Sequence, residues 1–250
     1  MDQAPGPVTR AVVLAAGRGT RMRELTDDLP KPMVRVAGRP ILERIVTGLA
    51  SAGIEQILVV VGYRKESIMD HFGDGSPFRV RIDYVEQVTQ DGTGRVVALA
   101  RAFAGDAPFL LSYGDILVNP SFYLRLLELG DAEMLLSVRR AADVSKGGAV
   151  YLNGAMEVTD LKEKPNPGEA ATPWYNAGIY TFRESIFGYT ARLQLSPRGE
   201  YELTDAIRAI AHAGMKVRAI EVTGDWVDVR DPEVLAGLNR RYAQDGCEPF

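Results

Sequence analysis

The stretch Leu14-Ala15-Ala16-Gly17-Arg18-Gly19-Thr20-Arg21-Met22, followed by Leu29-Pro30-Lys31-Pro32, is the most informative part of this sequence. It overlaps the end of an apolar run at 11–15, which predicts a buried strand. In open α/β sheets, ligands bind beyond the carboxyl ends of the strands. The two glycines carry no β-carbon, so backbone N–H groups of this loop can approach phosphate oxygens closely. Arg21 and Lys31 add positive charge, so the stretch predicts a polyphosphate-binding loop.

Other interpretations of the Gly17-x-Gly19 pair stay open from the residues alone. It is compatible with a plain turn, because short glycine patterns often match by chance. A dinucleotide-binding fingerprint is disfavoured, because position 22 is Met and Gly62 stands where a ribose-binding acid would end the next strand. A P-loop is excluded, because no Gly-Lys-Ser or Gly-Lys-Thr occurs in the chain.

Short apolar runs alternate with amphipathic stretches along the first half of the chain, and the second half is more mixed. This order predicts an α/β fold with a mainly parallel, mixed central sheet covered on both faces. The predicted strands are at 11–15, 57–61, 80–85, 108–112, 132–138, 149–152 and 177–182. The predicted helices are at 40–52, 65–72, 95–103, 120–129, 200–213 and 232–243.

Composition sets further limits on the class of protein. The 250 residues carry a formal net charge of -4, with 46% hydrophobic and 25% charged residues, and no block of like charge stands out. We therefore expect a globular protein that does not bind nucleic acid. No apolar run approaches the roughly 18 residues of a membrane span, and the opening residues do not resemble a signal peptide. The single cysteine, Cys247, excludes a disulfide within the chain and suits a reducing compartment.

We accordingly expect a cytoplasmic protein without a membrane partner. Residues 1–9 are interpreted as a flexible leader and residues 10–245 as a single domain. No hexapeptide repeat follows, so no left-handed β-helix domain is expected. The oligomeric state, including a homo-oligomer, is left open.

Residues 14–32 closely resemble the signature of the sugar-1-phosphate nucleotidyltransferases, the pyrophosphorylase superfamily, which reads roughly L-A-A-G-x-G-T-R-M followed by a P-K-P element. This long, spaced pattern is far more specific than two glycines, and the resemblance continues over about residues 10–240. It implies a Rossmann-like, GT-A-type three-layer sandwich. It also implies that the loop cradles a nucleoside triphosphate, with Arg21 and Lys31 on the phosphates. The loop residues assigned to the nucleotide are Leu14, Ala15, Ala16, Gly17, Gly19 and Thr20.

A second match, Glu86-Gln87 followed by Gly92-Thr93-Gly94, resembles the family's base-binding segment in its uridylyl- and thymidylyltransferase form. The resemblance implies that Gln87, Gly92 and Thr93 bind the nucleotide, with UTP or dTTP favoured. A side-chain amide offers both a donor and an acceptor to a base edge. From the residues alone, the segment is also typical of a strand end and a helix-starting turn. The Gln87–Gly92 spacing and Arg95, where many relatives have His, depart from the pattern. A cytidylyl- or guanylyltransferase, acting on a sugar phosphate or choline phosphate, therefore stays open.

Two aspartates are candidate metal ligands. Asp115 follows the predicted strand at 108–112, and Asp228 lies in Trp226-Val227-Asp228-Val229. Mg²⁺ in proteins prefers one or two carboxylates together with waters and substrate phosphates. Taken alone, an aspartate after a strand is more often a cap or turn former. The resemblance implies that both residues hold Mg²⁺.

Three further segments resemble the family's sugar site: Gly147-Gly148, Glu163-Lys164-Pro165 and Asn176-Ala177-Gly178-Ile179-Tyr180. The resemblance implies that the sugar is bound by Gly148, Glu163, Asn176 and Gly178, and that Lys164 is a catalytic partner of a phosphate. Without it, the charges at 160–164 would indicate a solvated loop. Residues 200–205 resemble the family's E-Y-x-L-T-D helix start near the site.

The expected reaction is in-line attack of a sugar 1-phosphate oxygen on the α-phosphorus of the triphosphate, with release of pyrophosphate. Positioning and charge neutralisation would then be the main tasks of the protein. A related glycosyltransferase is disfavoured, because Gly114-Asp115-Ile116-Leu117 lacks the second acid of an Asp-x-Asp motif. A non-catalytic subunit that binds nucleotide sugars is disfavoured by the presence of Arg21, Lys31 and both aspartates.

Overall fold

The structure is a computed structural model that describes residues 6–245, with side chains described as far as Ala243. Cys247 and the first five residues of the predicted leader lie outside the described part. Of the leader residues that are described, Val8 is buried, and the carbonyl of Thr9 accepts hydrogen bonds from the backbone N–H groups of Glu55 and Gln56 at 2.9 and 3.2 Å.

The chain passes back and forth between two compact units, which are described separately. Unit 2 contains residues 9–88, 112–124 and 223 onward, and unit 1 contains residues 89–111, residues 125–222 and the described residues up to Val8. Strand β6 (Phe109–Tyr113) and helix α5 (Ser121–Leu127) begin in one unit and end in the other. The units therefore do not follow one another as separate stretches of sequence.

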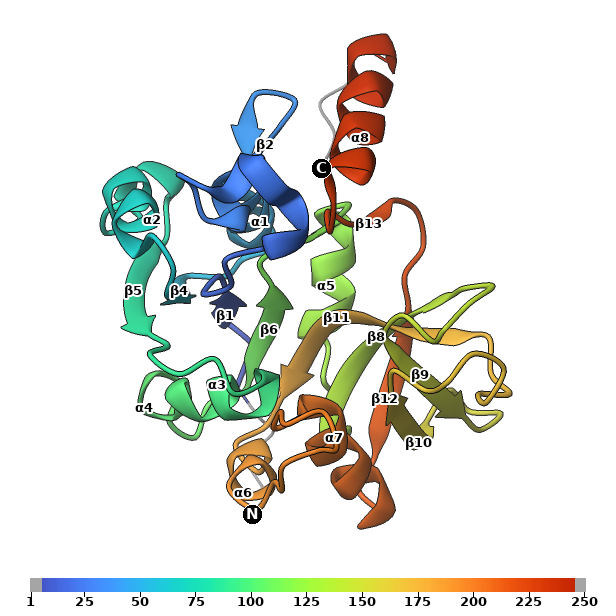
Figure 1. The fold of residues 1–250 in the computed structure, drawn as a ribbon. Coiled ribbons are helices and arrows are strands. Elements are labelled where there is room, and N and C mark those ends of the chain that lie inside the picture. Colours follow the sequence, from blue (N-terminus) through green and yellow to red (C-terminus); the bar gives the residue numbers. More distant parts are fainter. Residues whose placement is uncertain (1–5, 246–250) are drawn as a thin grey trace. The chain divides into compact units, whose positions relative to one another are not determined.

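Unit 2 is built on parallel strands β1 (Arg10–Leu14), β4 (Gln56–Val61) and β5 (Arg81–Glu86), with β4 between the other two. They follow one another in Figure 1 as the blue-to-cyan arrows. β1 and β4 are apolar and buried over most of their length, which is the pattern of strands covered on both faces. β5 has mixed exposure, as its alternating sequence predicts.

The helices of unit 2 cover these strands and hold the loops at their ends. Helix α1 buries the apolar stripe that was expected at 3.6-residue spacing, including Ile41, Ile45 and Leu49. Helix α8 contacts the segment after β1, and its Asn239 accepts a hydrogen bond from the N–H of Ala37 at 2.8 Å. The helical elements are α1 (Ile41–Ser51), α2 (Lys65–Phe72), α8 (Pro232–Asp245) and the short 3₁₀ helices η1 (Thr20–Thr26), η2 (Lys31–Met33) and η3 (Ser76–Phe78).

Two small antiparallel pairs complete unit 2. They are β2 (Arg35–Val36) with β3 (Arg39–Pro40), and β7 (Ile116–Val118) with β13 (Trp226–Asp228). The second pair joins chain segments more than 100 positions apart in the sequence.

Unit 1 holds a mixed set of strands in the order β10-β9-β11-β8-β12. The β8–β12 pair is parallel, and the other pairs are antiparallel. Helix α7 packs against β10 and also contacts α3 and α6. In the core, the rings of Phe109 and Phe187 stack with their centroids 5.6 Å apart. The elements of this unit are β8 (Met134–Arg140), β9 (Gly148–Leu152), β10 (Val158–Glu163), β11 (Trp174–Phe182), β12 (Val217–Glu221), α3 (Thr93–Leu99), α4 (Arg101–Ala104), α6 (Ile186–Thr190) and α7 (Leu203–His212).

The predicted α/β fold with a mixed, largely parallel sheet is confirmed, and the predicted helix at 65–72 has the observed limits. Other limits were wrong. The helix predicted at 95–103 is split into α3 and α4, because the chain tightens at Ala100, whose N–H donates to the carbonyl of Val97 at 3.0 Å. The helix predicted at 200–213 begins only at Leu203, because Glu200 closes a turn with Ser196.

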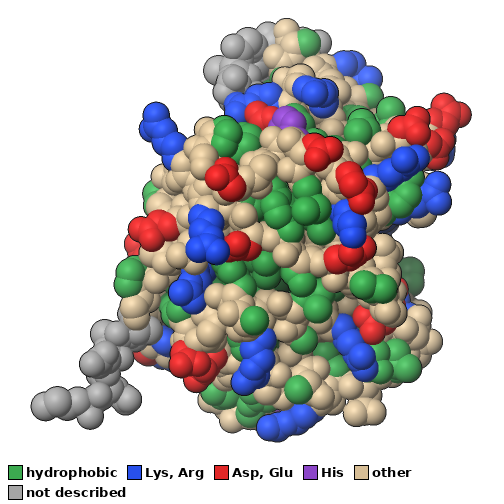
Figure 2. All heavy atoms as spheres, turned by 90° about the vertical axis from the view of Figure 1, so that its left-hand side faces the viewer, with side chains coloured by type: hydrophobic (Ala, Val, Ile, Leu, Met, Phe, Trp, Pro, Cys, Tyr) green, Lys and Arg blue, Asp and Glu red, His purple; other side chains and the backbone are tan. Residues whose placement is uncertain are grey.

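On the face drawn in Figure 2, basic and acidic side chains are interspersed, without a large patch of one sign. No helix in the described part of the chain combines the length and apolar character that crossing a bilayer needs.

Candidate functional site

The loop after β1 is held closely on two sides by glycines of unit 2. The N–H of Gly114 donates to the carbonyl of Leu14 at 2.9 Å, and a β-carbon at 114 would lie 2.5 Å from that oxygen. A β-carbon at Gly62 would lie 2.7 Å from the carbonyl oxygen of Ala16. Only glycine permits such approaches, so these two residues fix the floor of the loop.

The two glycines of the loop itself differ in their surroundings. Gly19 has φ +73°, and a β-carbon there would lie 2.6 Å from the Cβ of Lys31. Gly17 is exposed and has no atom within 4 Å of a β-carbon position. Gly19 is therefore required by the path of the lysine, whereas the backbone at Gly17 is open to a ligand.

The remaining loop residues predicted to bind the nucleotide divide by exposure. Ala15 and Ala16 are buried, Leu14 is half-buried, and Thr20 and Arg21 are exposed. The first three form the backbone floor, and the last two present polar groups to solvent. Their contacts with a nucleotide stay a prediction.

Lys31 is the most buried charged residue of this site, with only 7% of its surface exposed. Its Nζ donates to Oδ2 of Asp115 at 2.5 Å and lies 4.0 Å from Oδ1 of Asp228. A buried ammonium is stable only when it is paired. The structure thus brings one predicted phosphate ligand and both predicted metal ligands into one cluster.

The β7–β13 pair explains why these aspartates meet. Asp228 is the last residue of β13 and lies opposite Ile116, next to Asp115. The N–H of Val229 donates to the carbonyl of Asp115 at 2.9 Å. Asp115 and Asp228 are 28% and 20% exposed at their side chains, so both carboxylates are largely withdrawn from water but remain accessible.

The surroundings of Asp228 disfavour the ionised form of its carboxyl group. Burial, and then the neighbouring charge of Asp115, raise the pKa of Asp228 to about 6, although Lys31, Arg230 and Arg21 act in the opposite direction. Arg21 is therefore close enough to act on this carboxylate. No group of three or more Asp, Glu, His or Cys side chains forms a metal-binding cluster within residues 6–245. Asp115 and Asp228 offer two carboxylates, and proteins bind Mg²⁺ through one or two carboxylates together with waters and substrate oxygens, so Mg²⁺ at this site stays a prediction.

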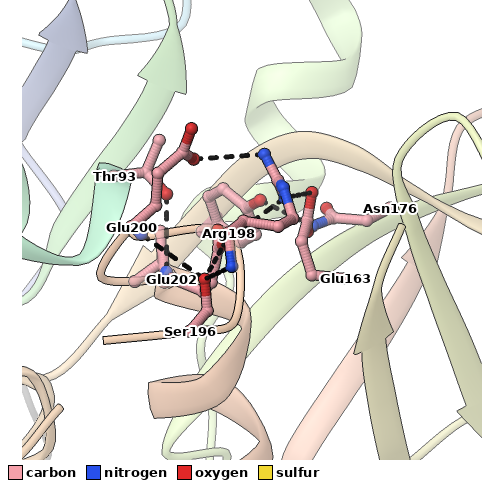
Figure 3. Close-up of polar contacts among 9 residues, drawn as sticks. Thr93, Glu163, Asn176, Ser196, Arg198, Glu200 and Glu202 are labelled. Atoms are coloured by element: carbon pink, nitrogen blue, oxygen red, sulfur yellow. Dashed lines mark hydrogen bonds and ion pairs between the residues drawn. The ribbon is translucent and has the colours of Figure 1, made fainter. Parts of the chain in front are cut away.

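The predicted sugar-binding residues come together in unit 1. Glu163 ends β10 directly opposite Gly148, the first residue of β9. A β-carbon on Gly148 would lie 2.9 Å from the Cβ of Asn176 on β11. Glycine at 148 is therefore needed for the close packing of these strands, and Figure 3 shows Asn176 beside Glu163.

A bulge in β11 sets the direction of Asn176. The register between β11 and β8 shifts between Asn176 and Tyr180, and Gly178 has φ +80° inside the bulge. The amide of Asn176 donates to Oη of Tyr180 at 2.8 Å and accepts from the N–H of Gly178 at 3.1 Å. The amide is thus fixed in orientation, and its contact with a sugar stays a prediction.

Glu163 and Lys164 differ sharply in environment. Burial, and then the nearby charge of Glu202, raise the pKa of Glu163, while Lys164 and Arg198 oppose this. Lys164 is exposed and has φ +40°, a strained conformation for a residue with a β-carbon, and its N–H donates to the carbonyl of Gly147 at 2.7 Å. The catalytic role of Lys164 stays a prediction.

The predicted base-binding residues are distributed over both units: Gln87 belongs to unit 2, and Gly92 and Thr93 belong to unit 1. Gly92 has φ +114°, and a β-carbon there would lie 2.5 Å from the carbonyl oxygen of Tyr201. The guanidinium of Arg95, which departs from the family pattern, lies 4.1 Å from the centre of the Tyr201 ring. The glycine and the arginine thus have packing roles within unit 1, and base recognition stays a prediction.

The motifs did not single out Arg198, which meets Glu163 and Glu202 in unit 1 (Figure 3). It lies just before the Glu200–Asp205 segment, whose acids were expected only near the site. A lone arginine in a polar loop gives no signal of its own in a sequence, because its partners come from β10 and from the start of α7.

Comparisons with known proteins agree with this geometry. The nucleotidyl transferase family model matches residues 10–245. A UTP–glucose-1-phosphate uridylyltransferase, AglF, of Haloferax volcanii is 36% identical over 241 residues, which cover 94% of this chain and 97% of that protein. The bifunctional protein GlmU of Methanococcus maripaludis strain C5 is 35% identical over 232 residues, or 93% of this chain. The chain spans about half the length of that relative, 54%.

Solved structures show the same fold. A UDP-glucose pyrophosphorylase in complex with UDP-glucose has a TM-score of 0.83 at 22% identity, covering 95% of this chain and 99% of that one. A putative glucose-1-phosphate thymidylyltransferase of Bacillus anthracis has a TM-score of 0.84 at 22% identity, covering 96% and 97%. With the family match over nearly the whole chain, these findings establish that the chain belongs to the nucleotidyl transferase family.

Proposed function

We propose that this chain joins a nucleoside triphosphate, UTP or dTTP, to a sugar 1-phosphate, giving a nucleotide sugar and pyrophosphate. Membership of the nucleotidyl transferase family supports the reaction class, and the uridylyltransferase of Haloferax volcanii, matched over 97% of its length, supports the substrate classes. The observation that carries the proposal is the meeting of Lys31 with Asp115 and Asp228 in unit 2, which also contains the open backbone at Gly17.

The reaction does not require a general base, because the attacking oxygen of a sugar 1-phosphate is already anionic near neutral pH. The difficulty is instead to bring two anions together and to stabilise the departing pyrophosphate. Fixed positive charges and backbone N–H groups, held in place before the substrates arrive, meet both requirements. The rigid floor of the β1 loop and the buried Lys31 have these properties.

The two aspartates supply the donor set for Mg²⁺. Asp115 and Asp228 would hold the ion, which when bound supplies a Lewis-acid charge to the phosphates. Their side chains are partly exposed and share one ammonium, so they offer anionic oxygens that a cation can reach.

Two further basic residues, Arg21 and Lys164, would neutralise charge on the phosphates. Arg21, exposed and within electrostatic reach of Asp228, would stabilise the pyrophosphate together with Lys31. Lys164 would offset the repulsion between the two anionic substrates. On the sugar, Glu163 would accept a hydrogen bond from a hydroxyl, and Asn176 would donate its remaining N–H.

The proposal places the protein in the cytoplasm, where nucleoside triphosphates are made, and it leaves the oligomeric state and the sugar open. The test is a matrix of five nucleoside triphosphates against several sugar 1-phosphates, read by pyrophosphate release with Mg²⁺ and with EDTA. We expect release with UTP or dTTP, in the presence of Mg²⁺ only. Release with none of the pairs would overturn the proposal, and release with CTP or GTP alone would correct the base.

A further inference from the structure

Arg198 connects three acidic side chains of unit 1 (Figure 3). Its Nη1 lies 3.2 Å from Oε1 of Glu202 and 3.7 Å from Oε1 of Glu163, and its Nη2 lies 3.2 Å from Oε2 of Glu200. The three carboxylates thus share one guanidinium, although Glu163 comes from a distant strand.

Two of these acids are withdrawn from water. The side chain of Glu202 is 7% exposed and that of Glu163 is 21% exposed, whereas Glu200 is 45% exposed. Like charges in poorly solvated surroundings repel each other strongly unless a cation lies between them. Arg198 is the cation that contacts both buried carboxylates, so its removal would leave them facing each other.

The segment that carries Arg198 forms a turn that is held by its own backbone hydrogen bonds. The N–H of Gly199 donates to the carbonyl of Ser196 at 2.8 Å, and the N–H of Ser196 donates to the carbonyl of Glu200 at 2.9 Å. The hydroxyl of Ser196 also donates to Oε1 of Glu202 at 3.1 Å. The turn therefore fixes the backbone position of Arg198 just before α7.

We propose that Arg198 is a positioning residue, which neutralises the buried Glu163–Glu202 pair and thereby keeps Glu163 in place as the hydrogen-bond acceptor for the sugar. This inference rests on the proposed function of Glu163. A carboxylate only accepts hydrogen bonds, whereas a protonated carboxyl group also donates one. Without Arg198, the two carboxylates would repel each other without a neutralising partner, and Glu163 would no longer be held as an acceptor for the sugar.

The charged groups around Glu163 allow a specific test of the positioning role of Arg198. The charged groups that act on it are Glu202, Lys164 and Arg198, and Lys164 is exposed. If Arg198 is replaced, Glu202 is the neighbouring charge that still raises the pKa of Glu163, in addition to the effect of burial. Replacing Glu202 as well should therefore relieve the defect, because a glutamine at 202 keeps an oxygen that can accept from Ser196 but carries no charge.

The experiment compares Arg198→Gln, Glu202→Gln and the double variant with the wild type, and uses Arg192→Gln as the matched control. Arg192 belongs to the segment between α6 and α7 and is exposed. We expect Arg198→Gln to raise the KM for the sugar 1-phosphate by about tenfold at pH 7. The KM for the triphosphate should stay within about twofold, and the double variant should recover most of the loss.

The outcomes separate positioning from other roles. If Arg198 contacts the substrate itself, or only holds the turn together, Glu202→Gln will not rescue Arg198→Gln, and the inference is overturned. An unchanged KM in Arg198→Gln, or an equal rise for both substrates, overturns it as well. Rescue together with a KM defect confined to the sugar 1-phosphate supports it.

A second readout does not depend on activity. Thermal melting from pH 5 to 8 should show that Arg198→Gln is destabilised by about 5 °C at pH 8, less at pH 5, and that the double variant regains this loss. If the wild type releases no pyrophosphate from any pair of substrates, the proposed function fails, and these melting curves still decide whether Arg198 neutralises the pair. Parallel curves for both Arg198 variants would exclude that neutralisation.

Discussion

A β-carbon built on Gly19 would lie 2.6 Å from the Cβ of Lys31, so the lysine can follow its present path only while position 19 is glycine. The same residue has φ +73°, which strains any residue with a β-carbon. We expect Gly19→Ala to lower the free energy of unfolding by about 1–2 kcal/mol. It should also reduce kcat/KM at least tenfold, because Lys31 is displaced from Asp115. Chemical denaturation and pyrophosphate release measure the two effects.

Gly17→Ala is the matched variant, since no atom lies within 4 Å of a β-carbon at that position. The free energy of unfolding should change by less than about 0.5 kcal/mol. The KM for the triphosphate should rise, because the β-carbon occupies space that the loop leaves open to phosphates. An unaffected KM would show that the triphosphate does not approach Gly17.

The aspartates are predicted to be equivalent for activity but different for stability. Asp115→Asn and Asp228→Asn should each reduce Mg²⁺-dependent pyrophosphate release by more than about 100-fold. Asp115→Asn should also destabilise the protein by about 2 kcal/mol, because it removes the negative charge that lies 2.5 Å from the buried ammonium of Lys31. Asp228→Asn leaves that pair intact and should not destabilise the protein. Exposed Asp106→Asn is the control, and normal turnover in both site variants would remove the metal assignment.

Lys31→Ala tests the role of the ammonium. Loss of a charge that stabilises the leaving pyrophosphate should reduce kcat by about 100-fold. Lys65→Ala, which removes a lysine paired with Glu86 elsewhere in unit 2, should retain nearly full activity. A KM effect without a kcat effect would mean that Lys31 binds substrate but does not act on the transition state.

Tyr180 is predicted to hold Asn176 in its sugar-facing orientation. Tyr180→Phe removes the acceptor of the 2.8 Å hydrogen bond from the Asn176 amide, at a cost of about 1 kcal/mol. The KM for the sugar 1-phosphate should rise, while the KM for the triphosphate should not. Tyr189→Phe, which removes the hydrogen bond from the Tyr189 hydroxyl to the sulfur of Met215, is the control. An equal effect of both substitutions on the KM would argue against the orientation role.

Local pattern was sufficient for the parts of the fold that depend on short-range periodicity. The stripe of α1 and the buried β1 and β4 follow directly from residue spacing, and so does the loop that exposes Gly17. The β7–β13 pair could not be derived in this way, because each strand has only three residues and its partner is more than 100 positions away. That pair is nevertheless what joins Asp115 to Asp228.

In the candidate site, too, local sequence predicted the residues but not their long-range contacts. Motif resemblance identified Lys31, Glu163 and Asn176, but it gave no sign that Lys31 pairs with Asp115 or that Asn176 is held by Tyr180. It also passed over Arg198, whose partners lie on other elements. Residue identities carry the chemistry of a site, whereas the contacts that orient and charge it arise only from the tertiary fold.

Glu163 offers a test of the electrostatics of the sugar site that does not need a substrate. Burial, and then the charge of Glu202, raise its pKa above the ordinary value of 4.5. The folded state therefore binds this proton more tightly than the unfolded state, and stability falls as the pH rises through the interval between the two pKa values. Glu163→Gln cannot ionise, so it should be more stable than the wild type at pH 7–8, and this gain should disappear below about pH 4.5.

The control for this measurement is Glu128→Gln, since Glu128 is exposed in the same unit. Its melting curve should run parallel to that of the wild type across the whole pH range. Glu163→Gln should at the same time weaken binding of the sugar 1-phosphate, because its amide replaces a charged acceptor. A more stable protein with a weaker substrate site is the expected signature of a carboxylate kept in place for function at the expense of stability. A variant that loses stability at pH 8 would instead mean that the contact with Arg198 outweighs the burial of Glu163.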